Sequence, residues 1–204
     1  MTFNIAVEDD LSESVVKKIL ALEGCSVARR FPDRDRLQAS PGKGHLLKKI
    51  TAYNASSAIV PFLMMLDLDT STCAPEMLRV WMPFAPNPRF LLRVAVRETE
   101  TWLLADRHGM ASFLGIAISS LPAHPEDLAD PKAALIALAR RSRSKRLRES
   151  IVPIEQGIPI GPDYNGILSG FVNAQWDIDE ASKNSDSLMR ARLAIRRALD
   201  NAPS

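Results

Sequence analysis

An uncharged apolar run that stops at two carboxylates constrains this chain more than any other feature. The nine residues from Ala58 to Leu66 carry no charge, and Asp67 and Asp69 follow directly. A short run of this kind is typical of a strand that is buried on both faces of a parallel sheet. A buried helix would also show no alternation of apolar and polar residues. The short length and Pro61, which a strand tolerates near its start, favour the strand.

Asp67 and Asp69 are two residues apart, so in a strand their side chains point to the same face. We expect them at the carboxyl end of the sheet, where open α/β sheets bind their ligands. Two neighbouring carboxylates repel each other, and Mg²⁺ or Mn²⁺, which prefer oxygen ligands, relieve that repulsion. Asp is also common in turns, because its side chain bonds the nearby backbone. Taken alone, Asp67 and Asp69 are as consistent with a turn as with a metal site.

Two more apolar strands end in acidic residues. Residues 3–7 lead into Glu8, and residues 89–96 lead towards Glu98 and Glu100. If the strands are parallel neighbours, these side chains gather at one edge of the sheet. Carboxylates without histidine or cysteine partners argue against zinc and suit magnesium-dependent phosphoryl chemistry. The structural alternative is that the acidic residues complement helix dipoles near helix N-termini.

Helical patterns follow the strands and dominate the second half of the chain. The length of 204 residues is enough for one α/β domain with a helical appendage. We therefore predict an α/β core over residues 1–110, with a mostly parallel sheet flanked by helices. Residues 111–204 are expected to form a mainly helical C-terminal region that packs on this core. Ser12 is the expected N-cap of the first helix. The predicted helices span residues 13–22, 45–52, 75–82, 131–141, 167–176 and 186–199, and a further amphipathic helix is expected within residues 97–106, after the acidic residues.

Local basic patches must supply any affinity for nucleic acid, because the net charge is only +2. A second basic face is expected on the last helix, from Arg190 to Arg197. The densest patch, within residues 140–148, is either a solvated helix end or a surface that contacts backbone phosphates. Its cations are Arg140, Arg141, Arg143, Lys145, Arg146 and Arg148.

Other sequence features narrow the class of protein. Cys25 and Cys73 match no metal or redox spacing, which is typical of reduced thiols. The start of the chain does not resemble a signal peptide, and no apolar run reaches membrane-spanning length, so we expect a cytoplasmic protein. A polar loop over residues 31–43 ends in Gly42-Lys43-Gly44. That segment is either a plain turn or a cradle for a phosphate on backbone N–H groups.

Several short motifs occur along the chain in this order: Val7-Glu8-Asp-Asp-Leu-Ser-Glu13, Gly42-Lys-Gly-His-Leu46, Leu66-Asp-Leu-Asp69, Val96-Arg-Glu-Thr-Glu-Thr-Trp-Leu-Leu-Ala-Asp106, Asp130-Pro-Lys132 and the helix at Ser187-Leu188. Together they resemble the Toprim domain shared by topoisomerases, primases and overcoming-lysogenization-defect nucleases. More closely, most of the chain resembles the stand-alone Toprim-like bacterial proteins grouped as domain of unknown function 4276. The signal lies in the order of the motifs and their strand contexts.

The resemblance implies a Toprim-like (Rossmann-like) fold and roles for particular residues. Glu8 would be the general acid/base or first metal ligand, and Asp67 and Asp69 would hold Mg²⁺ or Mn²⁺. Glu13 and Glu100 would supply ligands for a second ion.

The resulting hypothesis is a metal-dependent nuclease or related phosphotransfer enzyme that acts on nucleic acid, DNA in preference to RNA, in phage defence or DNA repair. A partner protein encoded elsewhere would complete a solitary unit of this kind. One alternative is a non-catalytic Toprim-like module that binds nucleic acid or a partner. The other is a small-molecule phosphohydrolase that uses Gly42-Lys43-Gly44 as its phosphate cradle.

Overall fold

A computed structural model describes residues 1–33, 42–71, 73–155 and 157–201 of the chain. Its centre is a four-stranded sheet in the order β2-β1-β3-β4, in which every neighbouring pair is parallel. The prediction of an α/β fold with a mostly parallel sheet, flanking helices and a helical C-terminal end is therefore confirmed. The strands are β1 (Thr2–Ala6), β2 (Ser26–Phe31), β3 (Phe62–Asp67) and β4 (Phe90–Ala95).

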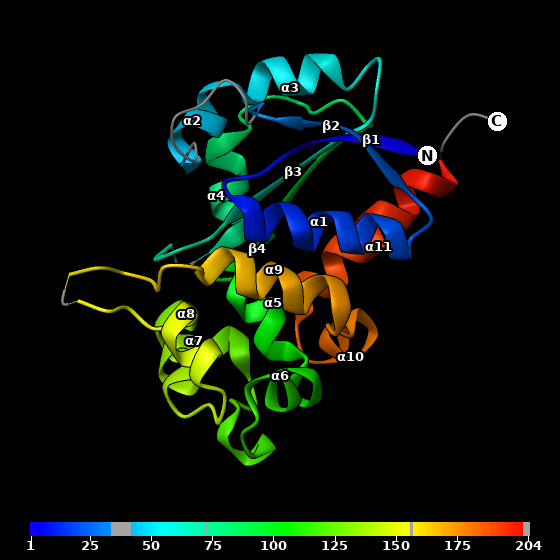
Figure 1. The fold of residues 1–204 in the computed structure, drawn as a ribbon. Helices are drawn as coiled ribbons and strands as arrows, with labels where there is room; N and C mark the ends of the chain where they lie inside the picture. Colours follow the sequence, from blue (N-terminus) through cyan, green and yellow to red (C-terminus); the bar gives the residue numbers. More distant parts are fainter. Residues whose placement is uncertain (34–41, 72, 156, 202–204) are drawn as a thin grey trace.

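Helices connect the strands and dominate the second half of the described chain (Figure 1). Those of the first half are α1 (Asp10–Leu22), α2 (Lys43–Lys48), α3 (Ile50–Ser56), α4 (Ala74–Trp81), α5 (Thr99–Ala105) and α6 (Arg107–Leu114). Two 3₁₀ turns follow, η2 (Ile118–Ser120) and η3 (Pro125–Asp127). The remaining helices are α7 (Pro131–Arg140), α8 (Lys145–Ile151), α9 (Tyr164–Ala174), α10 (Ile178–Lys183) and α11 (Asp186–Asp200).

Both faces of the sheet are buried, which explains the uncharged run in β3. Alternate residues of a strand point to opposite faces. Leu63 and Met65 pack in a core that includes residues of α1, α5, α9 and α11. Phe62, Met64 and Leu66 pack in a second core with residues of α2, α3 and α4. All five are at most 2% exposed, so the interpretation of this run as a doubly buried strand is confirmed.

The C-terminal helices share the first of these cores with the sheet. Trp102 of α5, Leu168 of α9 and Ile195 of α11 belong to the same cluster as Ile5 of β1. The expected boundary after residue 110 falls inside α6, so one continuous core crosses it. Figure 1 shows α1 and α9 side by side beneath the sheet. Across the ranges described above, no helix is long and apolar enough to cross a membrane.

Several element boundaries differ from the predictions. The N-cap of α1 is Asp9, whose carboxylate accepts a hydrogen bond from the Ser12 N–H at 2.8 Å, so Ser12 is not the cap. The helix predicted over residues 45–52 is two helices, because the backbone turns at Lys49 (φ −105°, ψ 1°). Helix α9 begins at Tyr164, three residues before its predicted start at residue 167, and helices α6, α8 and α10 were not predicted. These three missed helices have at most eight residues, too few to show a clear period.

Candidate active site

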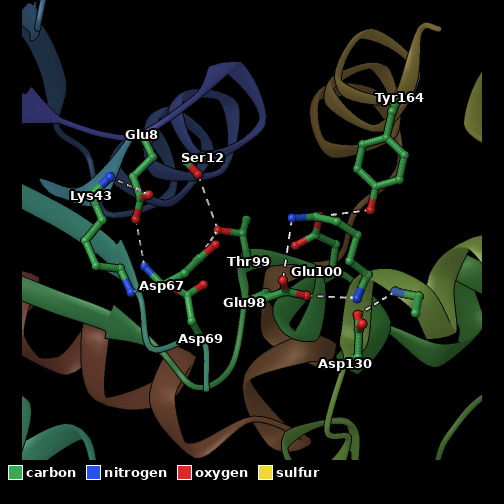
Figure 2. A network of polar contacts seen from close by, with 12 residues as sticks. Glu8, Ser12, Lys43, Asp67, Asp69, Glu98, Thr99, Glu100, Asp130 and Tyr164 are labelled. Atoms are coloured by element: carbon green, nitrogen blue, oxygen red, sulfur yellow. Dashed lines mark hydrogen bonds and ion pairs between the residues drawn. The ribbon is translucent and has the colours of Figure 1, made fainter. Parts of the chain in front are cut away.

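The carboxyl ends of β1, β3 and β4 bring acidic residues from distant parts of the chain together. These three strands are neighbours, and in the register of β3 and β4 Asp67 lies opposite Ala95. Glu8 follows β1, Asp67 ends β3, and Glu98 is the N-cap of α5 just after β4. Figure 2 shows the resulting row of side chains, from Lys43 and Glu8 through Asp67 to Glu100 and Tyr164. We call this the acidic row.

Backbone amides fix the Glu8 carboxylate. The N–H of Lys43 donates to Glu8 Oε2 at 3.0 Å, and the N–H of Asp67 donates to Glu8 Oε1 at 3.2 Å. Burial raises the pKa of Glu8 above its ordinary value, while the Asp67 amide and the Lys43 charge oppose that rise. The Lys43 amide of the Gly42-Lys43-Gly44 turn is thus used by a carboxylate of the protein. This arrangement favours the plain turn over the phosphate cradle.

Asp67 is the most strongly perturbed carboxylate of the row. The Thr99 hydroxyl donates to Asp67 Oδ1 at 2.9 Å. The Thr99 hydroxyl proton is used in that hydrogen bond. The Ser12 hydroxyl, 3.4 Å from Thr99 Oγ1, is therefore the donor to Thr99. Burial raises the pKa of Asp67 well above its usual range, and the charges of Glu100 and Glu8 raise it further. The row therefore holds more negative charge than its immediate surroundings neutralise.

Asp69 lies outside the strand and differs from Asp67 in its environment. Its backbone is left-handed (φ 55°), and the facing Arg97 at the end of β4 is left-handed too (φ 65°). Their backbones are joined by a hydrogen bond of 2.7 Å from the Asp69 N–H to the Arg97 carbonyl. Asp tolerates this conformation better than a long side chain does. The Asp69 carboxylate is half exposed and forms an ion pair with Lys43.

Glu98 and Glu100 are held by the start of α7. The N–H of Lys132 donates to Glu98 Oε2 at 2.9 Å, and the Lys132 ammonium lies 3.5 Å from Glu98 and 3.6 Å from Glu100. The Tyr164 hydroxyl, which is buried, donates to Glu100 Oε1 at 2.8 Å. Burial raises the pKa of Glu100, and the neighbouring Lys132 opposes that rise. Glu100 is 2% exposed, so it acts on Asp67 as a buried charge.

The second predicted ligand of a second ion, Glu13, has cationic partners. Its carboxylate lies 3.0 Å from Arg30 Nε of β2 and 2.6 Å from Lys17 Nζ, one turn further along α1. These contacts explain why a glutamate can be 8% exposed in α1. They give Glu13 a structural role in joining α1 to the edge strand β2.

The two basic regions predicted from the sequence differ in their exposure and in their ion pairs. Most cations of the 140–148 region are exposed, because the chain leaves α7, turns at Ser142–Ser144 and starts α8. Arg148 is partly buried and donates to the Ser142 carbonyl. A pocket of about 530 Å³ is lined by Glu98, Lys132 and Arg140, so it joins the acidic row to this region.

The basic face expected from Arg190 to Arg197 is wrong for Arg192, which is buried, whereas Arg196 is exposed there but paired with a carboxylate. Arg192 is 4% exposed and lies 2.9 Å from Glu23 and 2.8 Å from Asp179. Arg196 lies 2.6 Å from Glu23. These arginines fasten α11 to the end of α1 and to α10. The sequence shows their charge but not these partners, because Glu23 is far away along the chain.

The donor set of the acidic row fits a hard divalent cation in its chemistry. Glu8, Asp67, Asp69 and Thr99 offer only oxygen atoms, and the carboxylates repel one another. Within the described ranges, however, no three His, Cys, Asp or Glu side chains converge as a ready-made metal site. Lys43 occupies one side of Asp69. A cation bound here would therefore compete with the Lys43 ammonium for that carboxylate.

Sequence reasoning missed four members of the row. Lys43, Thr99 and Lys132 contact the predicted carboxylates, and the Ser12 hydroxyl lies 3.4 Å from that of Thr99. Tyr164 also belongs to the row, because its buried hydroxyl donates to Glu100. The two lysines could have been found from the sequence, because they stand in the motifs Gly42-Lys43-Gly44 and Asp130-Pro131-Lys132.

Comparisons of the chain with protein-family models, with curated proteins and with solved structures found no match.

Proposed function

We propose that this protein is a magnesium- or manganese-dependent enzyme that hydrolyses phosphodiester bonds in nucleic acid, DNA in preference to RNA. The observation that carries the proposal is the acidic row at the carboxyl ends of three adjacent parallel strands, joined by a pocket to the exposed cations from Arg140 onward. Ligand sites of open α/β sheets lie at this edge. The arrangement supports a Toprim-like assignment, in agreement with the sequence motifs.

The chain's own residues have distinct tasks in this proposal. Asp67 and Asp69 would hold the cation, which when bound polarises the phosphate and lowers the pKa of water. Glu8, kept in place by the amides of Lys43 and Asp67, would take or give a proton at the scissile phosphate. Lys132 and Arg140 line the pocket that leads away from the row and would bind flanking phosphates.

Calorimetric titration with Mg²⁺ and Mn²⁺ tests the proposal directly. The wild type should bind the ion, and Asp67→Ala/Asp69→Ala should not. Asp186→Ala/Glu149→Ala is the matched control, because both residues form exposed ion pairs with a neighbouring turn of their own helices. Nuclease assays on single- and double-stranded DNA and RNA should follow the same order of variants. Metal-dependent cleavage that survives in Asp67→Ala/Asp69→Ala would refute the assignment.

A non-catalytic nucleic-acid-binding module is the second candidate, and one observation favours it. The Lys43 and Lys132 ammonium groups already neutralise part of the row, at Asp69 and at Glu98 and Glu100. Such a module would bind DNA without a divalent ion. Wild-type protein that binds DNA in EDTA, and that neither binds Mg²⁺ with DNA present nor cleaves it, would establish this candidate instead.

A further inference from the structure

A second cavity lies at the opposite end of the sheet from the acidic row. Its volume is about 700 Å³, and its lining includes Met1, Pro61, Arg89, Arg93 and Arg197. Met1, Pro61 and Arg89 directly precede β1, β3 and β4, so this is the amino end of the sheet. Figure 1 shows the chain's N-terminus beside the last turns of α11, which form the other wall. We call this the arginine cavity.

Arg93 is placed where a core residue would normally lie. It falls between Leu91 and Ala95 on β4, and both of these side chains are buried in the core on the α11 face. The alternation of the strand therefore directs Arg93 to the same face. Its Nε atom is buried and has no hydrogen-bond partner. Burial also lowers the pKa of Arg93.

Burying the Nε atom of Arg93, a partly exposed residue, without a partner is costly, because the lost hydration is not replaced. Arg30 and Arg192, which are also largely buried, each lie within 3.0 Å of a carboxylate oxygen. Arg93 has no such ion pair within the described part of the chain. An anion from outside the chain would supply the missing partner.

The rest of the lining specifies what kind of anion fits. Arg89 donates to the carbonyls of Ala58 and Ile59, at 3.0 and 3.3 Å, so its guanidinium is fixed at the wall. Arg197 is exposed at the end of α11. The lining residues include no Asp or Glu from the described ranges. Three guanidinium groups suit a doubly charged phosphate, which arginine binds through paired hydrogen bonds.

Apolar side chains complete the cavity, among them Pro61, Leu91 and Ala194. They would contact an uncharged part of a ligand, and the volume lies within the range of small-molecule sites, about 300–1,000 Å³. We propose that the arginine cavity binds a small phosphate monoester with a flat or apolar body, with its phosphate on Arg93 and Arg197. This site needs no divalent cation and is separate from the proposed hydrolytic site.

Calorimetry with AMP as the probe tests the inference. The titrations are done in EDTA, which removes any contribution of a metal-dependent site at the acidic row. Arg93→Met and Arg197→Met should each weaken AMP binding by about 10-fold or more, the scale of a lost charge-assisted hydrogen bond. Arg79→Met is the control, because Arg79 is an exposed helical arginine on α4, outside the cavity lining. It should bind AMP like the wild type.

Two further ligands distinguish the parts of the proposal. Adenosine, which lacks the phosphate, should bind at least about 10-fold more weakly than AMP, and inorganic phosphate should also bind more weakly. AMP binding that is absent at millimolar concentration, or that is matched by adenosine, would overturn the proposal. So would binding that is unchanged in Arg197→Met, a surface variant that folds whatever the fate of Arg93→Met. Phosphate that binds as tightly as AMP would reduce the cavity to a simple ion site and refute the organic ligand.

Discussion

Replacing Asp67 by asparagine should stabilise the metal-free protein, although it removes a proposed catalytic residue. Burial and the charges of Glu100 and Glu8 all disfavour the Asp67 carboxylate. The asparagine carbonyl can still accept the Thr99 hydrogen bond, which spans 2.9 Å in the wild type. One unit of pKa shift corresponds to about 1.4 kcal/mol. We expect a gain of about 1–2 kcal/mol at pH 7, the usual size for relieving one unfavourable functional-site contact.

The gain should depend on pH in a defined direction. The folded-state pKa of Asp67 lies above the ordinary value of 3.8, so the folded protein binds this proton more tightly than the unfolded chain does. Wild-type stability contributed by this group is fully present below pH 3.8 and is lost as the pH rises through the folded-state pKa. The advantage of Asp67→Asn should therefore be small in acid and largest at neutral pH.

Urea unfolding in EDTA, followed at several pH values, measures this advantage. Asp69→Asn is the matched control, because its half-exposed carboxylate is paired with Lys43, and it should change stability by no more than about 1 kcal/mol. Excess Mg²⁺ should reverse the order of wild type and Asp67→Asn. An ion at 100 times its Kd stabilises the form that binds it by about 2.7 kcal/mol. A loss of stability in Asp67→Asn in EDTA at pH 7 would refute the repulsion argument.

Three further outcomes test other parts of the structure. In urea unfolding, Arg192→Met should lower the free energy of unfolding by about 3–5 kcal/mol, because it leaves Glu23 and Asp179 without a buried partner. The control Arg79→Met should change it by no more than about 0.5 kcal/mol. Equal effects of the two variants would contradict the role given to Arg192. Burial raises the pKa of Glu23, but Arg196 and Arg192 outweigh that effect and hold the pKa below its ordinary value of 4.5. The stability that Glu23 contributes is therefore present above pH 4.5 and is lost as the pH falls. In Glu23→Gln the free energy of unfolding should consequently depend less on pH in acid. The triple variant Arg140→Gln/Arg143→Gln/Arg146→Gln should weaken DNA binding regardless of sequence and reduce the log–log salt slope by about 0.9 per lost phosphate contact. An unchanged slope would mean that this region is a solvated helix end.

The strands were the most predictable part of the fold. The run from Ala58 to Leu66 indicated a doubly buried strand because two cores exclude charge from both of its faces. Short helices were less predictable. Neither α8 nor α10 is long enough to show a clear period, and Lys49 breaks a helix without a proline or glycine.

Local sequence also placed the carboxylates of the acidic row, because each follows an apolar strand and parallel neighbours end at one edge. It could not assign their partners. Lys43 and Glu8 are 35 positions apart, and Tyr164 and Glu100 are 64 apart, so no local pattern links them. These contacts determine which carboxylate is neutralised and which keeps a raised pKa.

The class of fold, the edge of the sheet that carries the acidic residues and the positions of the basic segments all followed from the amino-acid sequence. The partners of the arginines did not: Arg192 and Arg196 bind Glu23, whereas Arg93 lies in a cavity without a carboxylate. This difference arises because the cost of burying a charge depends on which distant groups surround it. Those neighbours are set by the packing of α11 against the sheet and α1, not by the residues next to each arginine in the chain.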